Sequence, residues 1–297
     1  MNDLRIDVSL VSNLIASQFP KWSHFPILPV KDGGWDNCTF HLGDAMLVRL
    51  PSAACYSEQV AKEQRWLPKL APLLPLQIPS PLGIGSPSSA YPWRWSVYGW
   101  IDGETAAVAP IDDKVGFAET LGQFLVAFHR IDANDGPPPG AHNFYRGGAL
   151  QTYDRQTRDA IAALGGTIDA NTVTQIWQAA LASSWRSVPV WVHGDISPGN
   201  LLVNHQRLTA VIDFGCLGVG DPACDLSIAW TFFDASSREA FRKSVPLDDA
   251  TWARARGWAL WKALIVSAKL PGTNSAETER AIRTLGEIIA DYQIATR

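Results

Sequence analysis

The sequence has 297 residues, of which 46% are hydrophobic and 18% are charged. This length and apolar content suit a globular chain with one large domain or two lobes. The formal net charge of −4, without any lysine-rich run, excludes the usual basic surface of a nucleic-acid-binding protein. The most apolar late stretch, WALWKALIVSA, is interrupted by Lys262 and is too short to span a bilayer. We therefore expect a cytoplasmic protein that binds neither nucleic acid nor membrane.

The first hundred residues alternate short β-prone runs with turns. The runs CTFHLGD, AMLVRLP and WRWSVYGWI are rich in residues that favour strands. Between them, SEQVAKEQRWL predicts a helix over residues 57–67, with Ser57 as its N-cap. Pro68 is expected to close this helix or to follow shortly after its end.

Beyond these runs the sequence becomes mainly helical. DDKVGFAETLGQFLVAFHRI predicts an amphipathic helix capped by Asp112 or Asp113, and YDRQTRDAIAAL and NTVTQIWQAALASSW predict two more. From Pro222 onward the pattern is helical almost to the end. A β-rich part followed by a helix-rich part predicts two lobes, residues 1–101 and 102–297, with a cleft between them.

Acidic and amide side chains are concentrated in VWVHGDISPGNLLVNHQRLTAVIDFG, residues 190–215. LLVN and LTAVID predict a β-hairpin with NHQR as its turn. Asp195 and Asn200 precede this hairpin and Asp213 follows it. Because a hairpin returns the chain to its starting point, we expect the three side chains to converge. Oxygen ligands of this kind suit Mg²⁺, which usually takes one or two carboxylates together with substrate phosphates.

The spacing of these residues indicates phosphoryl transfer. That reaction needs a positioned nucleophile, metal ions on the phosphates and a carboxylate to accept the hydroxyl proton. Asp195 five residues before Asn200, followed by D-F-G at Asp213, reproduces the catalytic-loop and metal motifs of protein kinases. Each motif alone is weak because turns favour Asp, Asn and Gly, whereas the combination is specific.

Other conspicuous residues in this half are expected to have structural roles. His193 ends an apolar strand and is predicted to be a hydrogen-bonded scaffold residue. Asp221 and Asp225 stand where a helix begins, so they are expected to satisfy free backbone amides, with Asp225 bracing the catalytic loop. Trp258 and Trp261 favour core packing, and the alternative is an aromatic wall for an acceptor.

HGDISPGN, IDFG and GDPACDLSIAW resemble the aminoglycoside phosphotransferase family. The likeness extends to GGWDNCTF, LVRLP, KEQRWLP and YPWRWSVYGWIDGE, so it covers most of the chain. It implies an α+β, two-lobed protein-kinase-like fold with a small antiparallel-sheet N-lobe and a larger, mostly helical C-lobe. It also implies an ATP- and Mg²⁺-dependent phosphotransferase that moves the γ-phosphate to a hydroxyl, the alcohol group of a small-molecule acceptor.

The resemblance assigns roles to individual residues. Asp195 would be the catalytic carboxylate that orients the acceptor hydroxyl, and Asn200 and Asp213 would hold Mg²⁺. The nucleotide would be bound by Arg49 on the LVRLP strand, Glu63 as its ion-pair partner, Gly34 and Asn37 in the covering loop, and Tyr98 and Trp100 in the linker whose backbone reads adenine.

The sequence departs from the family pattern in two ways. Arg49 stands where kinases usually keep a lysine. The two side chains are not interchangeable, because the arginine guanidinium presents a fork of hydrogen-bond donors whereas the lysine ammonium is a compact point charge. The loop GGWDNCTF also lacks the GxGxxG pattern, and no GxxxxGK[ST] is present, which excludes the P-loop class.

Three functions stay open at this point. They are an antibiotic-modifying enzyme, which could confer antibiotic resistance, a metabolic kinase for a sugar or amino alcohol, and a catalytically silent nucleotide-binding protein. The joint presence of Asp195, Asn200 and Asp213 argues against the third. The motifs specify neither the acceptor, nor the choice between ATP and GTP, nor an oligomeric state.

Overall fold

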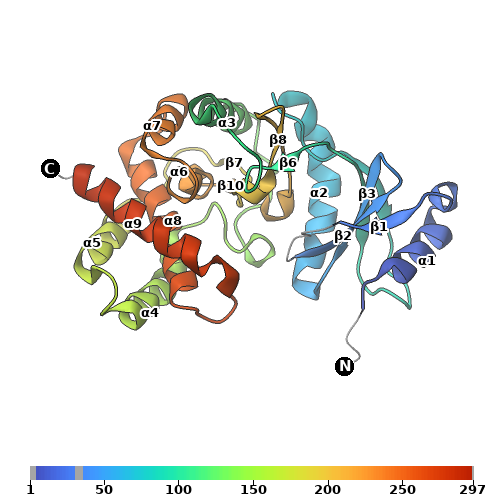
Figure 1. The fold of residues 1–297 in the computed structure, drawn as a ribbon, viewed down its shortest axis with the longest axis horizontal. Helices are drawn as coiled ribbons and strands as arrows, with labels where there is room; N and C mark the ends of the chain where they lie inside the picture. Colours follow the sequence, from blue (N-terminus) through green and yellow to red (C-terminus); the bar gives the residue numbers. More distant parts are fainter. Residues whose placement is uncertain (1–4, 31–35, 296–297) are drawn as a thin grey trace.

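The structure is a computed structural model, and it describes residues 5–30 and 36–295. An antiparallel sheet is built from the first hundred residues, and a larger, mostly helical part follows (Figure 1). The sheet lies at one end of the molecule with α1 (Val8–Gln18), and α2 (Ser57–Leu70) lies between the sheet and the rest (Figure 1).

The remaining elements follow in chain order. The strands are β1 (Ile27–Pro29), β2 (Asn37–Leu42), β3 (Met46–Pro51), β4 (Pro81–Gly85), β5 (Trp95–Gly99), β6 (Glu104–Thr105), β7 (Val190–Val192), β8 (Leu201–Asn204), β9 (Arg207–Val211) and β10 (Gly218–Gly220). The helices of the second part are α3 (Lys114–His129), α4 (Asp154–Leu164), α5 (Ala170–Leu181), α6 (Ile228–Thr231), α7 (Ala235–Ser244), α8 (Asp249–Ser267) and α9 (Thr278–Ala295).

The first sheet has the strand order β1-β2-β3-β5-β4, with every neighbouring pair antiparallel. Its two faces follow from the alternation of side chains along each strand. On β3, Val48 and Leu50 are buried in one cluster with the apolar residues of α1. The residue between them, Arg49, faces the opposite side, where it reaches Glu63 of α2. This alternation brings a cation from the sheet to the side that faces the helical part.

Helix α2 differs from its prediction at both ends. Ser57 is the first helical residue rather than the N-cap, and its hydroxyl donates to the carbonyl of Ala54. Pro68 lies inside the helix, which continues to Leu70. Although proline lacks an N–H for the preceding turn, Leu67 and Leu70 are both buried in the main core. This packing stabilises the last turn beyond the proline.

The elements that carry the catalytic motifs are short. β8 and β9 form the predicted hairpin, but its turn contains only His205 and Gln206, both with positive φ. The turn is shorter than the predicted NHQR because Asn204 and Arg207 already pair as strand residues. This is the two-residue connection whose twist suits a hairpin. β7 pairs with β10, so the strand before the catalytic loop is joined to the segment after the D-F-G motif.

The helical part is organised around α8, which packs against α4, α5 and α9. The predicted cap of α3 is confirmed, since Asp113 accepts a hydrogen bond from the amide of Gly116 at 2.8 Å. Within the described part of the chain, no helix has the length and apolar character needed to cross a bilayer.

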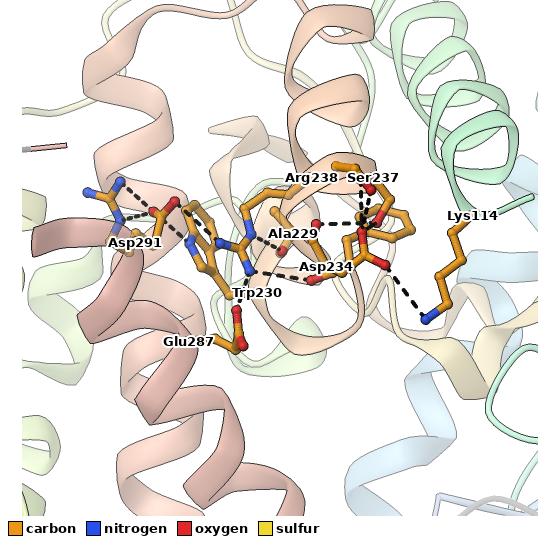
Figure 2. Close-up of polar contacts among 11 residues, drawn as sticks. Lys114, Ala229, Trp230, Asp234, Ser237, Arg238, Glu287 and Asp291 are labelled. Atoms are coloured by element: carbon orange, nitrogen blue, oxygen red, sulfur yellow. Dashed lines mark hydrogen bonds and ion pairs between the residues drawn. The ribbon is translucent and has the colours of Figure 1, made fainter. Parts of the chain in front are cut away.

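Helix α9 is held by a polar network around Asp291 (Figure 2). Its carboxylate accepts hydrogen bonds from Trp230 of α6 at 3.0 Å and from Arg256 of α8 at 2.9 Å. Arg238 of α7 reaches the other carboxylate oxygen at 3.3 Å and also pairs with Glu287 at 2.7 Å. One acidic side chain therefore connects four helices.

Candidate active site

The loop that follows β7 is held by a buried carboxylate. Asp225 accepts hydrogen bonds from the backbone amides of His193 and Gly194, each at 2.7 Å. This confirms the predicted bracing of the loop by Asp225. Gly194 has a φ of 84°, and a Cβ at this position would lie 2.6 Å from the carbonyl oxygen of Cys216. Only glycine fits this turn, which directs the next residue, Asp195, outward.

His193 connects the loop to the end of the hairpin. Its Nδ1 accepts from the amide of Asp195 at 3.2 Å, and its Nε2 donates to the carbonyl of Ile212 at 3.0 Å. These two partners require the tautomer with its proton on Nε2. The amide of Ile212 in turn donates to the carbonyl of Asn200 at 2.9 Å. His193 is therefore the hydrogen-bonded scaffold residue that the sequence predicts.

Asp195 and Asn200 lie side by side at the two ends of this loop. The Asn200 Nδ2 donates to the backbone oxygen of Asp195 at 2.9 Å and to its Oδ2 at 3.0 Å. Because the amide nitrogen is held in this way, the Asn200 Oδ1 is directed elsewhere. Asp195 is exposed and lines a cavity of about 640 Å³, where a ligand can reach its carboxylate.

Asp213 follows directly after Ile212 and has a left-handed backbone conformation, with a φ of 64°. Its Oδ1 accepts from the Arg49 guanidinium and, at 3.4 Å, from the amide of Gly215. Burial alone would raise the pKa of the Asp213 carboxyl, but the charge of Arg49 and these hydrogen bonds lower it below its usual value. Asp213 is therefore held as an anion next to the catalytic loop.

Arg49 bridges two carboxylates from distant parts of the chain. One end of its fork contacts Asp213, and the other donates to Glu63 of α2 at 3.1 Å. The Tyr98 hydroxyl donates to the second oxygen of Glu63. Burial opposes the charge of Arg49, but Asp213 and Glu63 together raise its pKa. The predicted ion pair between Arg49 and Glu63 is thus present, and its role in nucleotide binding stays a prediction.

Asp36 is a further carboxylate at this site, and the sequence prediction missed it. It accepts a hydrogen bond from Gln59 at 3.5 Å and lines the same cavity as Asp195. Burial, and then the negative charges of Asp213 and Asp195, raise the pKa of Asp36 above its ordinary value. The only sequence signal was an acidic residue after the glycine pair of GGWDNCTF.

The other residues predicted to bind the nucleotide lie at the sheet. Gly34 is outside the described residues, and Asn37 is the buried first residue of β2. Tyr98 belongs to strand β5 rather than to a linker, and its hydroxyl donates to the carboxylate of Glu63. The backbone amide of Trp100 donates to the carbonyl of Ala45 at 2.8 Å, so this N–H already has a partner within the protein.

The cavity beside Asp195 extends into the helical part. Trp258 and Trp261 of α8 form part of its lining, together with Arg146 from the loop before α4. The Arg146 guanidinium lies over both indole rings, 5.1 Å from each centroid. The two tryptophans are 2% and 5% exposed, as core packing predicts, but they also form one wall of the cavity. Arg146 was not predicted from the sequence, where it is a single cation between aromatic residues and a glycine pair.

The oxygen atoms at this site suit Mg²⁺ bound together with a phosphate ligand. The Asn200 Oδ1 and the Asp213 Oδ2 take no part in the hydrogen bonds described above. Across residues 5–30 and 36–295, no three His, Cys, Asp or Glu side chains are grouped to hold a metal ion unaided. Few protein ligands, all of them oxygen atoms, are typical of Mg²⁺ that is shared with substrate phosphates.

The sequence was compared with models of known protein families. The model of the phosphotransferase enzyme family matches residues 28–258, which include the sheet, the catalytic loop and the hairpin. The chain belongs to the phosphotransferase enzyme family. It is therefore an enzyme, and the resemblance inferred from its motifs is confirmed. A search of curated proteins finds no matching sequence.

Solved structures of phosphotransferases have the same fold. The GDP and kanamycin complex of APH(2")-IIia is similar over 95% of this chain and 98% of its own, with 20% identity and a TM-score of 0.74. The macrolide 2'-phosphotransferase MphH from Brachybacterium faecium is similar over 95% and 98% respectively, with 20% identity and a TM-score of 0.60. The streptomycin-ATP-APH(2")-IIa ternary complex is similar over 96% and 97%, with 18% identity and a TM-score of 0.57. These similarities confirm the two-lobed, protein-kinase-like fold.

Proposed function

We propose that this phosphotransferase transfers the γ-phosphate of ATP to a hydroxyl group of a small molecule, with Mg²⁺ as its metal ion. One observation carries this proposal. The backbone of Ile212 bonds to His193 and to Asn200 at the two ends of the catalytic loop, which holds the next residue, Asp213, close to this loop, and Asp195 of the loop lines a cavity. Two carboxylates and one carboxamide in this arrangement are what phosphoryl transfer to an alcohol needs.

Asp195 would orient the acceptor hydroxyl and accept its proton. Its exposed carboxylate faces the cavity, and its contact with the Asn200 amide fixes its direction. The hydroxyl oxygen forms a bond to the γ-phosphorus while the bond from that phosphorus to the bridging oxygen of ATP breaks. ADP leaves, and the hydroxyl proton is taken up by Asp195.

The phosphates would be bound by cationic and metal-binding groups. Asn200 and Asp213 would hold Mg²⁺ through the oxygen atoms that the protein's own hydrogen bonds leave open. When bound, Mg²⁺ neutralises part of the negative charge on the phosphates. Arg49 would contact phosphate oxygens with its fork, while Glu63 holds the guanidinium in place.

The nucleotide would lie between the first sheet and the catalytic segment. Similar structures contain GDP in one case and ATP in another, which supports a nucleoside triphosphate as donor. Gly34 and Asn37 would cover it, and the chain around Tyr98 and Trp100 would flank the base. We place the boundary between the lobes in the connection from β5 to α3, at residues 101 and 102, and we expect the enzyme to act in the cytoplasm.

The acceptor has two candidate classes. Similar structures are described with kanamycin or streptomycin, or as a macrolide phosphotransferase, which supports a drug-like hydroxyl compound and antibiotic resistance. A metabolite such as a sugar or amino alcohol would use the same catalytic groups. A catalytically silent protein is disfavoured because Asp195, Asn200 and Asp213 are all present and ordered around one loop.

The proposal is tested by incubating the enzyme with ATP, Mg²⁺ and a panel of hydroxyl compounds. Mass spectrometry would detect acceptors that gain one phosphoryl group, and ADP release would give the rate. For an acceptor so identified, Asp195→Ala should lower kcat by about 100-fold or more, because the hydroxyl proton loses its acceptor. Calorimetry should show nearly unchanged nucleotide binding.

A matched control is Asp159→Ala, an exposed acid on α4 whose removal should leave turnover unchanged. Full activity in the Asp195→Ala enzyme would refute the role of Asp195. If the wild-type enzyme bound no nucleotide and phosphorylated nothing, the whole proposal would fail.

A further inference from the structure

The cavity beside Asp195 carries an unusual balance of charge for a site that would bind a polycation. Within the described part of the chain, its charged lining consists of three acids, Asp36, Asp195 and Glu277, and three cations, Arg146, Lys262 and Arg280. Asp36 interacts electrostatically with Asp213 and with Asp195, so the two acids Asp36 and Asp195 belong to the catalytic end of the cavity. Apart from these two acids, the charged lining of the described residues has three cations and a single acid, Glu277.

Arg146 is the most firmly held of the three cations. Its guanidinium stacks on Trp258 and Trp261, and its loop is fastened by Asn143, whose Nδ2 donates to the Arg146 carbonyl at 3.1 Å. The Oδ1 of Asn143 also accepts from the amide of Gly140 at 3.0 Å. This cation is fixed in position before any ligand binds.

The charge of Arg146 has no anionic partner in the described structure. Its Nε is buried without a hydrogen-bond partner, and no carboxylate of the described residues lies within 4.0 Å of its guanidinium. Two other arginines with little exposed side-chain surface have carboxylate partners: Arg254 pairs with Asp221 at 2.6 Å, and Arg256 pairs with Asp291 at 2.9 Å. Arg146 therefore lines the cavity without an anion of the described residues beside it, and a bound ligand can supply the opposite charge.

We propose that the acceptor is a hydroxyl compound that carries a carboxylate or phosphate group, which binds Arg146 while the hydroxyl faces Asp195. The proposal rests on the phosphotransferase function proposed above and specifies its substrate class. A planar fork of donors matches both anions in the same way. Lys262 and Arg280 add positive charge to the lining of the same cavity. A polycationic aminoglycoside would meet these three cations, and apart from Asp36 and Asp195 at the catalytic end the described lining offers it only one acid, Glu277.

The test uses hydroxyl compounds of matched size in three groups. Hydroxycarboxylates and sugar phosphates are the anionic members, their amides and unphosphorylated sugars are the neutral members, and kanamycin is the cationic member. Each is incubated with ATP and Mg²⁺, and phosphoryl gain is measured by mass spectrometry. Binding of each compound to the enzyme with ADP and Mg²⁺ is measured separately by calorimetry. We expect anionic members to bind and react in preference to their neutral counterparts, and the comparison of carboxylates with phosphates identifies the anion.

Variants of the cavity wall then identify the group that binds the anion. Arg146→Gln should raise KM for the anionic acceptor by about 10- to 100-fold, because a charge-assisted hydrogen bond is lost. The kcat should change by less than about two-fold, since the contact is equally present in the ground and transition states. Arg146→Lys should restore part of the affinity. Arg155→Gln, an exposed cation on α4, is the matched control.

A second variant covers the case in which Arg146→Gln fails to fold. Lys262→Gln changes an exposed residue of α8 that lines the cavity, and it should raise KM for the anionic acceptor by about three-fold. The proposal is overturned if neutral compounds or kanamycin bind and react as well as the anionic ones, or if neither variant changes KM. If nothing is phosphorylated although Mg²⁺-ATP binds, the proposed function fails, and calorimetry still decides which charge class the cavity prefers.

Discussion

Asp234 is the N-cap of helix α7 and makes several polar contacts there. Its carboxylate accepts hydrogen bonds from the amide of Ser237 at 3.0 Å, from the Ser237 hydroxyl at 2.8 Å and from Ser236 at 2.9 Å (Figure 2). Lys114 of α3 lies 3.8 Å away. The hydrogen bonds from Ser237 lower the pKa of Asp234 to about 2. The N-terminus of α7 is therefore stabilised by an ionised carboxylate.

Replacing this cap should have a cost that depends on pH. Asp234→Ala should lower the free energy of unfolding by about 1 kcal/mol at neutral pH. The pKa of about 2 in the folded protein lies below the ordinary value of 3.8, so the ionic part of this stability is present above pH 3.8 and is lost as the pH falls toward 2. Urea unfolding of both proteins at pH 6 and pH 3 should show a smaller difference at pH 3. An equal difference at both pH values would contradict the assignment, and Ser236→Ala should cost less than Asp234→Ala.

At the residue scale, the sequence predicted the groups whose spacing is fixed by the chain itself. Asp195, Asn200 and Asp213 lie within one loop and one hairpin, so their convergence follows from local structure. Asp36 and Arg146 come from separate loops and reach the same cavity only through tertiary packing. No local pattern marks such residues, which is why the sequence did not identify them.

At the scale of elements, the attachment of α9 depends on side chains far apart in the sequence. Asp291 accepts from Trp230, Arg238 and Arg256, each on a different helix (Figure 2). Burial raises the pKa of Asp291, but the hydrogen bond from Trp230 and the two arginines lower it below its ordinary value overall. The start of α9 contributes Arg280 to the cavity, so this network also supports the acceptor wall.

Asp291→Ala should loosen α9. The change leaves Arg256 and part of Arg238 without their anion, and we expect a loss of about 2 to 3 kcal/mol in the free energy of unfolding. Hydrogen exchange should accelerate in α9 more than in α3. Glu287→Ala is the matched control, because this residue is more exposed than Asp291 and pairs with Arg238, and its loss should stay below about 1 kcal/mol. Equal losses in both variants would argue against a central role for Asp291.

The elements themselves were predicted unevenly. α3, α4 and α5 could be predicted because each has a helical repeat of apolar residues. β10 could not, since Gly218–Gly220 has no strand-like composition and becomes a strand only by pairing with β7. The predicted end of α2 was wrong, because the burial of Leu70 outweighs the effect of Pro68 on the last turn.

At the scale of the whole molecule, Arg49 joins the first sheet to the catalytic segment. Its contact with Asp213 spans 164 positions of the sequence, and its contact with Glu63 includes α2 in the same network. The proposed nucleotide would bind between these parts. Ligand binding should therefore stabilise the entire fold rather than one lobe alone.

This linkage can be measured by unfolding with and without ligand. At about 100 times the Kd, Mg²⁺-ATP should add about 2.7 kcal/mol to the free energy of unfolding. ATP with a chelator should add less, because Asp213 and Asn200 then face the phosphates without a cation. Asp213→Asn should abolish the difference between the two conditions, whereas Asp159→Asn should preserve it. A difference that survives in Asp213→Asn would remove Asp213 from the metal site.

The backbone bonding of Ile212 has a consequence for how the chain can vary in length. Its N–H and C=O are both bonded to the catalytic loop, so an added or deleted residue at the base of the hairpin would displace Asp213 relative to Asp195. The tip, His205–Gln206, is exposed and has no such attachment. Insertions should therefore be tolerated at the tip of this hairpin, whereas insertions at its base should impair the catalytic site.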